Sequence, residues 1–139
     1  MYKARLLIIP IVLFATTTIC HAKEPIKFTS AFFRMIQGGK ISEAYDQLFE
    51  GSLIPDQKPQ AVNELKKQTT SGLPMYGKII GIEKLREEKI GTSITRLVYI
   101  LKSELHPTIW EFYFYKPKDT WFLTNVIFND QFQSIQKLQ

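Results

Sequence analysis

The amino-acid sequence predicts an α+β fold, in which N-terminal helices pack on a curved four-stranded antiparallel sheet. In the first half of the chain, apolar residues recur at every third or fourth position, which is typical of amphipathic helices. From residue 78 onward the apolar period shortens to two, and β-branched and aromatic residues become frequent, which indicates strands. The breaks between these strands are short, so the strands should be joined as antiparallel hairpins.

Three helices are expected before the sheet. The first should end at Gly38 and Gly39, and it carries four apolar residues at helical spacing: Phe28, Phe32, Met35 and Ile36. The second has Ser42 as its expected N-cap and runs until Gly51. Pro59 can open a third helix, which should lie at the surface because its apolar positions are sparse.

Four strands are expected over residues 78–87, 93–102, 108–116 and 121–129. Alternation then assigns every side chain of the last three strands to one of two faces. The face expected to form the core carries Leu97, Tyr99, Leu101, Trp110, Phe112, Phe114, Leu123, Asn125 and Ile127. The opposite face carries Arg96, Val98, Ile100, Lys102, Ile109, Glu111, Tyr113, Tyr115, Phe122, Thr124 and Val126.

The first 22 residues are expected to be a signal peptide. Lys3 and Arg5 form a short basic lead, and the apolar run over residues 6–15 is too short to span a bilayer. Small residues before Lys23 predict cleavage after Ala22 and a periplasmic or secreted protein with no stable membrane span. Lipidation of Cys20 is the weaker alternative, because the residues before it fit a lipoprotein box poorly.

Removal of this segment changes the composition of the chain. The remaining 117 residues (139 less 22) contain no cysteine, which excludes disulfides and thiolate chemistry. Without Lys3 and Arg5 the 18 basic residues fall to 16, against 13 acidic residues, for a net charge of +3. Because these charges are dispersed along the chain, no nucleic-acid partner is expected. The length fits a single domain over residues 23–139.

Two segments are distinctive: the aromatic hairpin over residues 110–117 and 121–130, and the helix start over residues 39–45. With these segments the chain resembles, over residues 26–135, exported members of the nuclear-transport-factor-2-like (NTF2-like) superfamily. The resemblance implies a cone of helices closing over a concave sheet, often with an internal pocket. Members of that superfamily include isomerases and dehydratases as well as non-catalytic binding modules, so the fold does not decide the function.

The expected core face also holds the candidates for a ligand pocket. A buried amide needs hydrogen-bond partners, and Asn125 interrupts an otherwise apolar face, where it would bond either a ligand or the backbone. The aromatic residues around it are expected to serve first as core and second as a ligand platform. The pocket candidates are Phe32, Tyr99, Trp110, Phe112 and Asn125.

The opposite face is expected to be an interface. Helices can cover only one side of a small sheet, so the apolar groups on the other side should be buried in a homodimer, with Arg96 and Glu111 paired either within the chain or across the two-fold axis. The alternatives are that this face is exposed to solvent with scattered apolar residues, or that a C-terminal segment around Phe132 and Ile135 folds back over it. The interface candidates are Arg96, Val98, Ile100, Glu111, Tyr113, Tyr115 and Phe122.

The sequence predicts no catalytic residues, no cofactor and no metal. His106 lies at an expected hairpin tip, and with one histidine and no cysteine after cleavage a zinc site is excluded. The function expected is therefore non-catalytic binding of a small apolar ligand or a protein partner. One alternative is a small lyase or isomerase with Asp46 or Asp130 as base and Tyr99 or Asn125 polarising the substrate. The other is a structural subunit of an envelope assembly.

Overall fold

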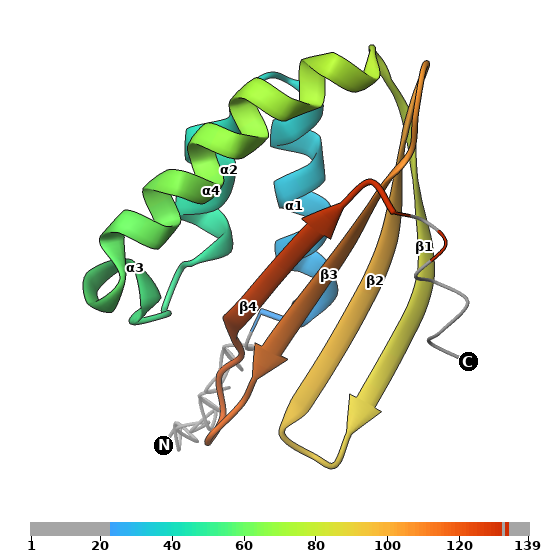
Figure 1. Ribbon diagram of the computed structural model, residues 1–139. Helices are drawn as coiled ribbons and strands as arrows, with labels where there is room; N and C mark the ends of the chain where they lie inside the picture. Colours follow the sequence, from blue (N-terminus) through green and yellow to red (C-terminus); the bar gives the residue numbers. More distant parts are fainter. Residues whose placement is uncertain (1–22, 132, 134–139) are drawn as a thin grey trace, which may run out of the picture.

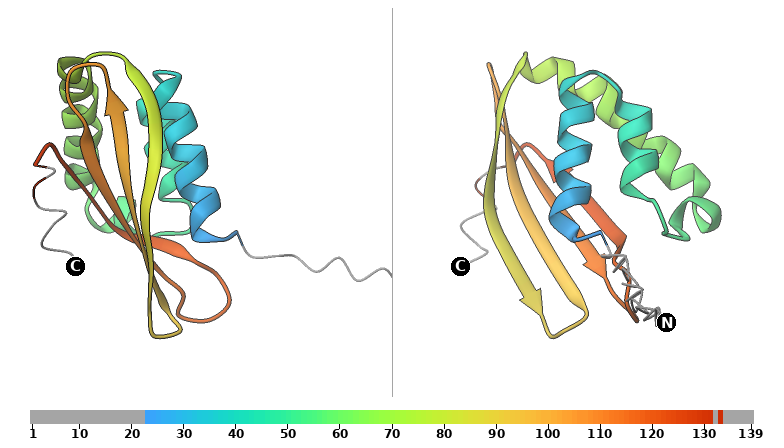
Figure 2. Two further views of the ribbon diagram at one scale, coloured as in Figure 1. Left: turned by 90° about the vertical axis from the view of Figure 1, so that its right-hand side faces the viewer. Right: turned by 180° about the vertical axis from the view of Figure 1, so that it is seen from behind.

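The computed structural model describes residues 23–131 and residue 133, and within them four α-helices precede a four-stranded antiparallel sheet (Figure 1). This confirms the predicted α+β class and the order of its elements. All the helices lie on one face of the sheet, as the two views of Figure 2 show. The expected signal peptide over residues 1–22 and the alternative that involves Phe132 and Ile135 lie outside the described residues.

Helix α1, Pro25–Gln37, supplies the central ridge of the helical layer. Pro25 opens the helix, where its missing N–H costs nothing. Phe28, Phe32 and Ile36 recur on its buried face. Gly39, with φ of +73°, ends the helix in the left-handed region, as the sequence predicts.

The remaining helices form an outer row, in which α2 buries Ala44, Tyr45 and Leu48 completely while the helices after it bury few side chains. Helix α2 spans Ile41–Leu48 and has Lys40 at its N-cap, so the expectation of Ser42 in that role is wrong. The one-turn helix α3, Ile54–Gln57, is absent from the sequence prediction. Helix α4 spans Pro59–Gly72 and buries only Val62 and Thr69, which confirms that it lies at the surface. A 3₁₀ turn, η1 (Leu73–Tyr76), leads into the sheet.

The four strands are paired in sequence order and joined by short connections. They are β1 (Ile79–Ile90), β2 (Ile94–Ser103), β3 (Thr108–Tyr115) and β4 (Phe122–Asn129). Each predicted strand is therefore confirmed, with bounds that differ by three residues at most. The concave face packs on α1 through Leu97, Tyr99, Leu101, Trp110, Phe112, Phe114 and Leu123, which are all buried.

A bulge in β4 reverses the faces of its second half. Tyr113 pairs with Asn125 while Phe114 pairs with Leu123, so Thr124 is an extra residue on β4, and its hydroxyl donates to the Tyr113 carbonyl over 3.0 Å. Beyond Thr124 the core side chains are Val126, which is 6% exposed, and Phe128, whose ring stacks on Trp110 at 4.5 Å between centroids. The expectation that Asn125 and Ile127 lie in the core is wrong, because strict alternation does not survive an inserted residue.

A second bulge, in β1, decides which charges face the helices. Lys84 pairs with Tyr99 but Arg86 pairs with Val98, so Leu85 is the extra residue. Glu87 and Lys89 consequently pair with Leu97 and Thr95 and share their concave face, whereas Arg86 and Glu88 share the convex face. Unbroken alternation would have placed Arg86 and Glu88 toward the helices instead.

Candidate functional site

Four of the five predicted pocket residues lie together, but as packed core. Phe32, Trp110 and Phe112 are 0% exposed, and Tyr99 is 6% exposed. The Phe32 ring centroid lies 5.4 Å from that of Trp110 and 5.5 Å from that of Phe112. These spacings are those of aromatic contact. The centre of the aromatic layer is therefore filled by side chains, and none of the four residues lines a cavity described below.

Four buried hydroxyls, three from the helices and one from β2, are hydrogen-bonded in pairs. The Tyr99 and Thr29 hydroxyls lie 2.7 Å apart, as do those of Tyr45 and Thr69. Burial raises the pKa of Tyr45 to about 12, and the hydrogen bond with Thr69 offsets part of that rise. Tyr99 thus binds within the core and does not point into open space, as substrate polarisation would require.

Asn125, the fifth pocket candidate, lies apart from the other four. It is exposed on the edge strand β4 and lines a separate groove of about 300 Å³ between that strand and the outer helices. Apolar side chains supply most of the groove: Phe49, Ile54, Ala61, Val62, Leu65 and Val126. The bulge therefore leaves the Asn125 amide exposed, and it is not a buried group that requires a ligand.

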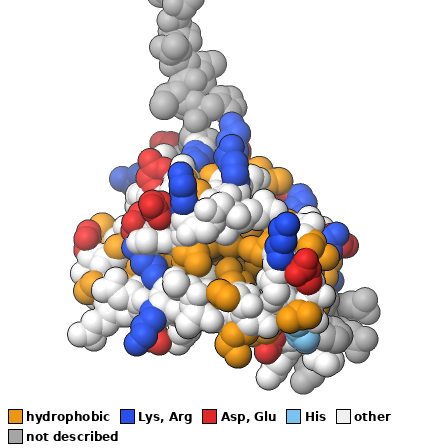
Figure 3. Space-filling view, turned by 90° about the horizontal axis from the view of Figure 1, so that it is seen from above, with side chains coloured by type: hydrophobic (Ala, Val, Ile, Leu, Met, Phe, Trp, Pro, Cys, Tyr) orange, Lys and Arg blue, Asp and Glu red, His pale blue; other side chains and the backbone are white. Residues whose placement is uncertain are grey.

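An apolar groove of about 210 Å³ lies where α1 ends and β1 begins, at the end of the molecule that Figure 3 views from above. The surface there is hollowed over hydrophobic side chains (Figure 3). Its lining is Ile36, Gly39, Ile41, Leu73, Pro74, Gly77 and Ile79. A specific small-molecule site also needs a few convergent polar groups, and this lining has no polar side chain.

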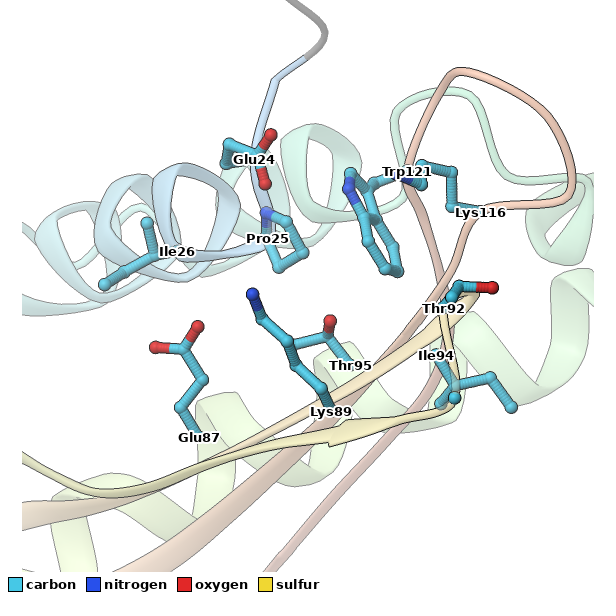
Figure 4. Close-up of a pocket in the computed structure, with 11 residues that line it drawn as sticks. Glu24, Pro25, Ile26, Glu87, Lys89, Thr92, Ile94, Thr95, Lys116 and Trp121 are labelled. Carbon is cyan, nitrogen blue, oxygen red and sulfur yellow. The ribbon is translucent and has the colours of Figure 1, made fainter.

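The opposite end holds a larger cavity, which we call the basal cleft. It measures about 440 Å³, within the range of small-molecule sites, and lies between the start of α1, the β1–β2 turn and the β3–β4 connection (Figure 4). It is lined by Glu24, Pro25, Ile26, Glu87, Lys89, Gly91, Thr92, Ile94, Thr95, Lys116 and Trp121. Apolar, hydroxyl and charged side chains therefore converge on one space.

Charged groups line the basal cleft at the residue before α1, on β1 and in the β3–β4 connection. Lys89 extends from β1 toward Glu24 and Pro25 at the start of α1, and Glu87 points up beside Ile26 (Figure 4). Glu87 is neutralised by Lys84, whose Nζ lies 2.9 Å from its Oε2. Within the described residues, neither the Lys89 ammonium nor the Glu24 carboxylate has a hydrogen-bond or ion-pair partner. The cleft thus contains charged groups that the described part of the chain leaves unpaired.

Trp121 supplies a flat apolar wall for the basal cleft. The Nζ of Lys116 lies 5.0 Å from the centroid of its ring, at cation–π distance. The indole also borders a second cavity of about 270 Å³, which Lys23, Phe28, Glu50 and Phe122 help to line. Trp121 is half-buried and stands between the two cavities. An aromatic or aliphatic group can therefore pack on it.

The predicted interface residues share the convex face, as the strand register shows. Val98 and Arg96 are buried, at 1% and 7% exposure, so the apolar patch is smaller than the sequence suggests. Tyr115 remains 38% exposed, and its ring meets that of Phe122 edge to face at 5.7 Å. Ile100 is half-buried.

Arg96 is the centre of an ion-pair network within the chain. Its guanidinium lies 2.8 Å from Glu111 and 3.1 Å from Glu88, and the Tyr113 hydroxyl donates to the same Glu111 oxygen over 3.1 Å. Although burial by itself lowers the pKa of Arg96, the hydrogen bonds to Glu111 and Glu88 outweigh it and hold the pKa above its usual value. Of the two pairings expected for Arg96 and Glu111, the structure shows the one within the chain.

The candidate acids and the histidine lie at the surface. Asp46 is 66% exposed and pairs with Lys66 at 2.6 Å, and Asp130 accepts a hydrogen bond from the Tyr76 hydroxyl over 3.1 Å. His106 lies in the β2–β3 turn, hydrogen-bonded to the Pro107 carbonyl over 2.8 Å. None of these three residues lines a cavity described above.

Two further properties concern the described residues as a set. No three of their histidine, cysteine, aspartate or glutamate side chains are grouped closely enough to hold a metal ion. Within residues 23–131 and 133, no helix combines the length and the hydrophobicity that crossing a membrane requires.

Sequence reasoning misses the basal cleft. Lys89 falls between the first and second expected strands, Trp121 begins the fourth, and no pattern marks Glu24, which precedes the first helix. The sequence feature that could have indicated the cleft is the presence of lysine, threonine and tryptophan at two turns that must lie beside each other in a meander.

Comparison with protein families, with curated proteins and with solved structures finds no match for this chain.

Proposed function

We propose that this chain is an exported, non-catalytic NTF2-like domain that binds a small amphipathic molecule in the basal cleft. The observation that carries the proposal is the lining of that cleft, where the Trp121 wall and charged groups that are unpaired within the described residues face a space of about 440 Å³. Ligand sites in proteins combine an apolar wall with a small number of polar groups in this way.

Because the aromatic core is filled, ligand binding is favoured in the basal cleft, at one end of the molecule, rather than between the helices and the sheet. Phe32, Trp110 and Phe112 occupy the centre, so the open space lies where α1 begins. Helices on one face of a curved antiparallel sheet agree with an NTF2-like architecture, and the residue pattern of the hairpin supports the assignment to that superfamily. A lyase or isomerase is disfavoured because Asp46 and Asp130 are exposed and already paired.

Export follows from the sequence pattern over residues 1–22. Cleavage after Ala22 would make Lys23 the first residue, beside Glu24 of the basal cleft. We expect mass spectrometry of the protein from a Gram-negative host to give a chain that begins at Lys23. An acylated Cys20 or an intact Met1 at the N-terminus would contradict export in this form.

The test of binding uses an uncharged probe, N-phenyl-1-naphthylamine, whose fluorescence rises in an apolar site. We expect saturable binding to the mature chain and a large loss in Trp121→Ala, because that substitution removes the apolar wall. Tyr115→Ala, an exposed aromatic residue on the other face of the sheet, is the matched control and should bind like the wild type. Equal binding by all three proteins, or by none of them, would refute the proposed cleft.

The convex face is the second surface to which a partner could bind, either a second copy or a protein of an envelope assembly. The exposed Tyr115 and the half-buried Phe122 supply an aromatic pair there, and aromatic residues often anchor interfaces. We expect a homodimer by light scattering at micromolar concentration, and its dissociation in Tyr115→Glu. A monomeric mass for the wild type would contradict the homodimer without affecting ligand binding.

A further inference from the structure

We infer that the ligand of the basal cleft is an amphipathic anion, whose acidic group lies at Lys89 and whose apolar part packs on Trp121. This inference rests on the proposed binding function and adds the charge of the ligand. Both residues line the same cleft and enter it from different strands and connections (Figure 4).

The charges around the cleft favour an anion. Glu87 is compensated by Lys84 at 2.9 Å, which leaves Lys89 and Lys116 against the single carboxylate of Glu24. Lys116 is further held over the Trp121 ring at 5.0 Å, so its charge stays at the cleft. The lining alone, with Glu24, Glu87, Lys89 and Lys116, has no net charge, and counting Lys84, the partner of Glu87, brings the sum to +1 within the described residues. Cleavage after Ala22, as the sequence predicts, would add the α-ammonium of Lys23 one residue from Glu24.

The position of Lys89 depends on the bulge at Leu85. That extra residue turns Lys89 toward the helices, where it pairs with Thr95 across the strands and lies beneath the start of α1. A lysine with no protein partner in the described residues, placed in a cavity, can bind an acidic group without first breaking an ion pair. The bulge therefore places in the cleft a cation that has no partner among the described residues.

The apolar part of the ligand follows from the rest of the lining. Trp121, Ile94 and Pro25 border the cleft, and Ile26 beside them is 41% exposed. These side chains offer a flat and an aliphatic surface within the same 440 Å³ as the lysines. A small inorganic anion would leave the apolar part of the lining exposed to water. The class of ligand that fits the cleft is therefore an organic carboxylate or sulfonate with an aromatic or aliphatic body.

Two probes with the same aromatic frame separate this inference from the proposed function. 8-Anilinonaphthalene-1-sulfonate carries one negative charge, and N-phenyl-1-naphthylamine carries none. We expect the sulfonate to bind the mature chain more tightly, and its Kd to rise as sodium chloride is raised from roughly 20 to roughly 500 mM, because salt screens charge pairs. The Kd of the neutral probe should not rise over that range.

Three substitutions then test whether the preference for the charged probe arises from residues of the basal cleft. Lys89→Gln should raise the Kd of the sulfonate about fivefold, the change expected for one solvent-facing charge pair, and leave that of the neutral probe unchanged. Glu24→Gln should lower the Kd of the sulfonate, and it removes no cap because the Glu24 side chain makes no capping bond. Lys118→Gln, in the β3–β4 connection but outside the cleft lining, should change neither.

The outcomes distinguish the two claims. If both probes bind equally and Lys89→Gln affects neither, the cleft is an apolar site and the inference of an anion is wrong, while the proposed function stands. If neither probe binds, the proposed function fails together with the inference. Opposite shifts for Lys89→Gln and Glu24→Gln, seen with the sulfonate alone, would support an anion site, and a general loss of folding could not produce them.

Discussion

Replacing Phe112 with alanine removes a ring that joins the sheet to α1. Phe112 is 0% exposed, and its ring centroid lies 5.5 Å from that of Phe32, 5.6 Å from that of Phe33 and 5.9 Å from that of Tyr99. Truncation of a buried phenylalanine costs about 3–5 kcal/mol, and because this ring meets each of those neighbours edge to face we expect about 4 kcal/mol. At about 2.1 cal/mol/K of unfolding entropy per residue, this corresponds to a fall in Tm of roughly 15–20 °C.

Urea unfolding at low temperature, followed by circular dichroism, measures this loss. Phe112→Leu keeps most of the volume and should cost only about 1 kcal/mol, which guards against a variant that does not fold. Ile127→Ala is the control, because strict alternation assigns Ile127 to the same face, whereas the structure leaves it 42% exposed. We expect it to cost less than about 1 kcal/mol. An unchanged Tm in Phe112→Ala would refute the packing of this ring. An equal loss of unfolding free energy in Ile127→Ala would refute the bulge in β4.

Two further predictions concern buried polar groups. Because the pKa of Tyr45 is about 12 in the folded protein against 10.0 as its ordinary value, the unfolded chain ionises first, and stability should fall by roughly 2–3 kcal/mol between pH 10 and pH 12. Tyr45→Phe should lack this component, so parallel pH curves for the two proteins in urea unfolding would contradict it. Glu111→Gln should cost about 1–3 kcal/mol in the same assay, since it leaves the buried Arg96 with one acidic partner. Glu88→Gln, whose side chain is 46% exposed, should cost less than about 1 kcal/mol, and the reverse order would contradict the network.

The candidate site is less predictable than the fold. The sequence pattern places Phe32, Tyr99, Trp110 and Phe112 together correctly, because alternation along strands and helical spacing bring them to one layer. It cannot show whether that layer encloses space, since this depends on how closely rings far apart in the sequence approach one another, such as the 5.4 Å between Phe32 and Trp110. The sequence therefore predicts these residues as core first and as a ligand platform second, and only the ring spacings of the structure show that they are closely packed.

The sequence by itself determined the order and type of the main elements. Helical spacing before residue 78, alternation after it, and turn residues such as Gly39 are local properties that act over a few residues. Only the tertiary structure decided which side chains face which layer beyond Leu85 and Thr124. Each bulge inserts one residue into a strand, and the insertion is visible only in the pairing with the neighbouring strand. A shift of one residue turned Asn125 out of the core and Lys89 into the basal cleft, because successive side chains of a strand point to opposite faces.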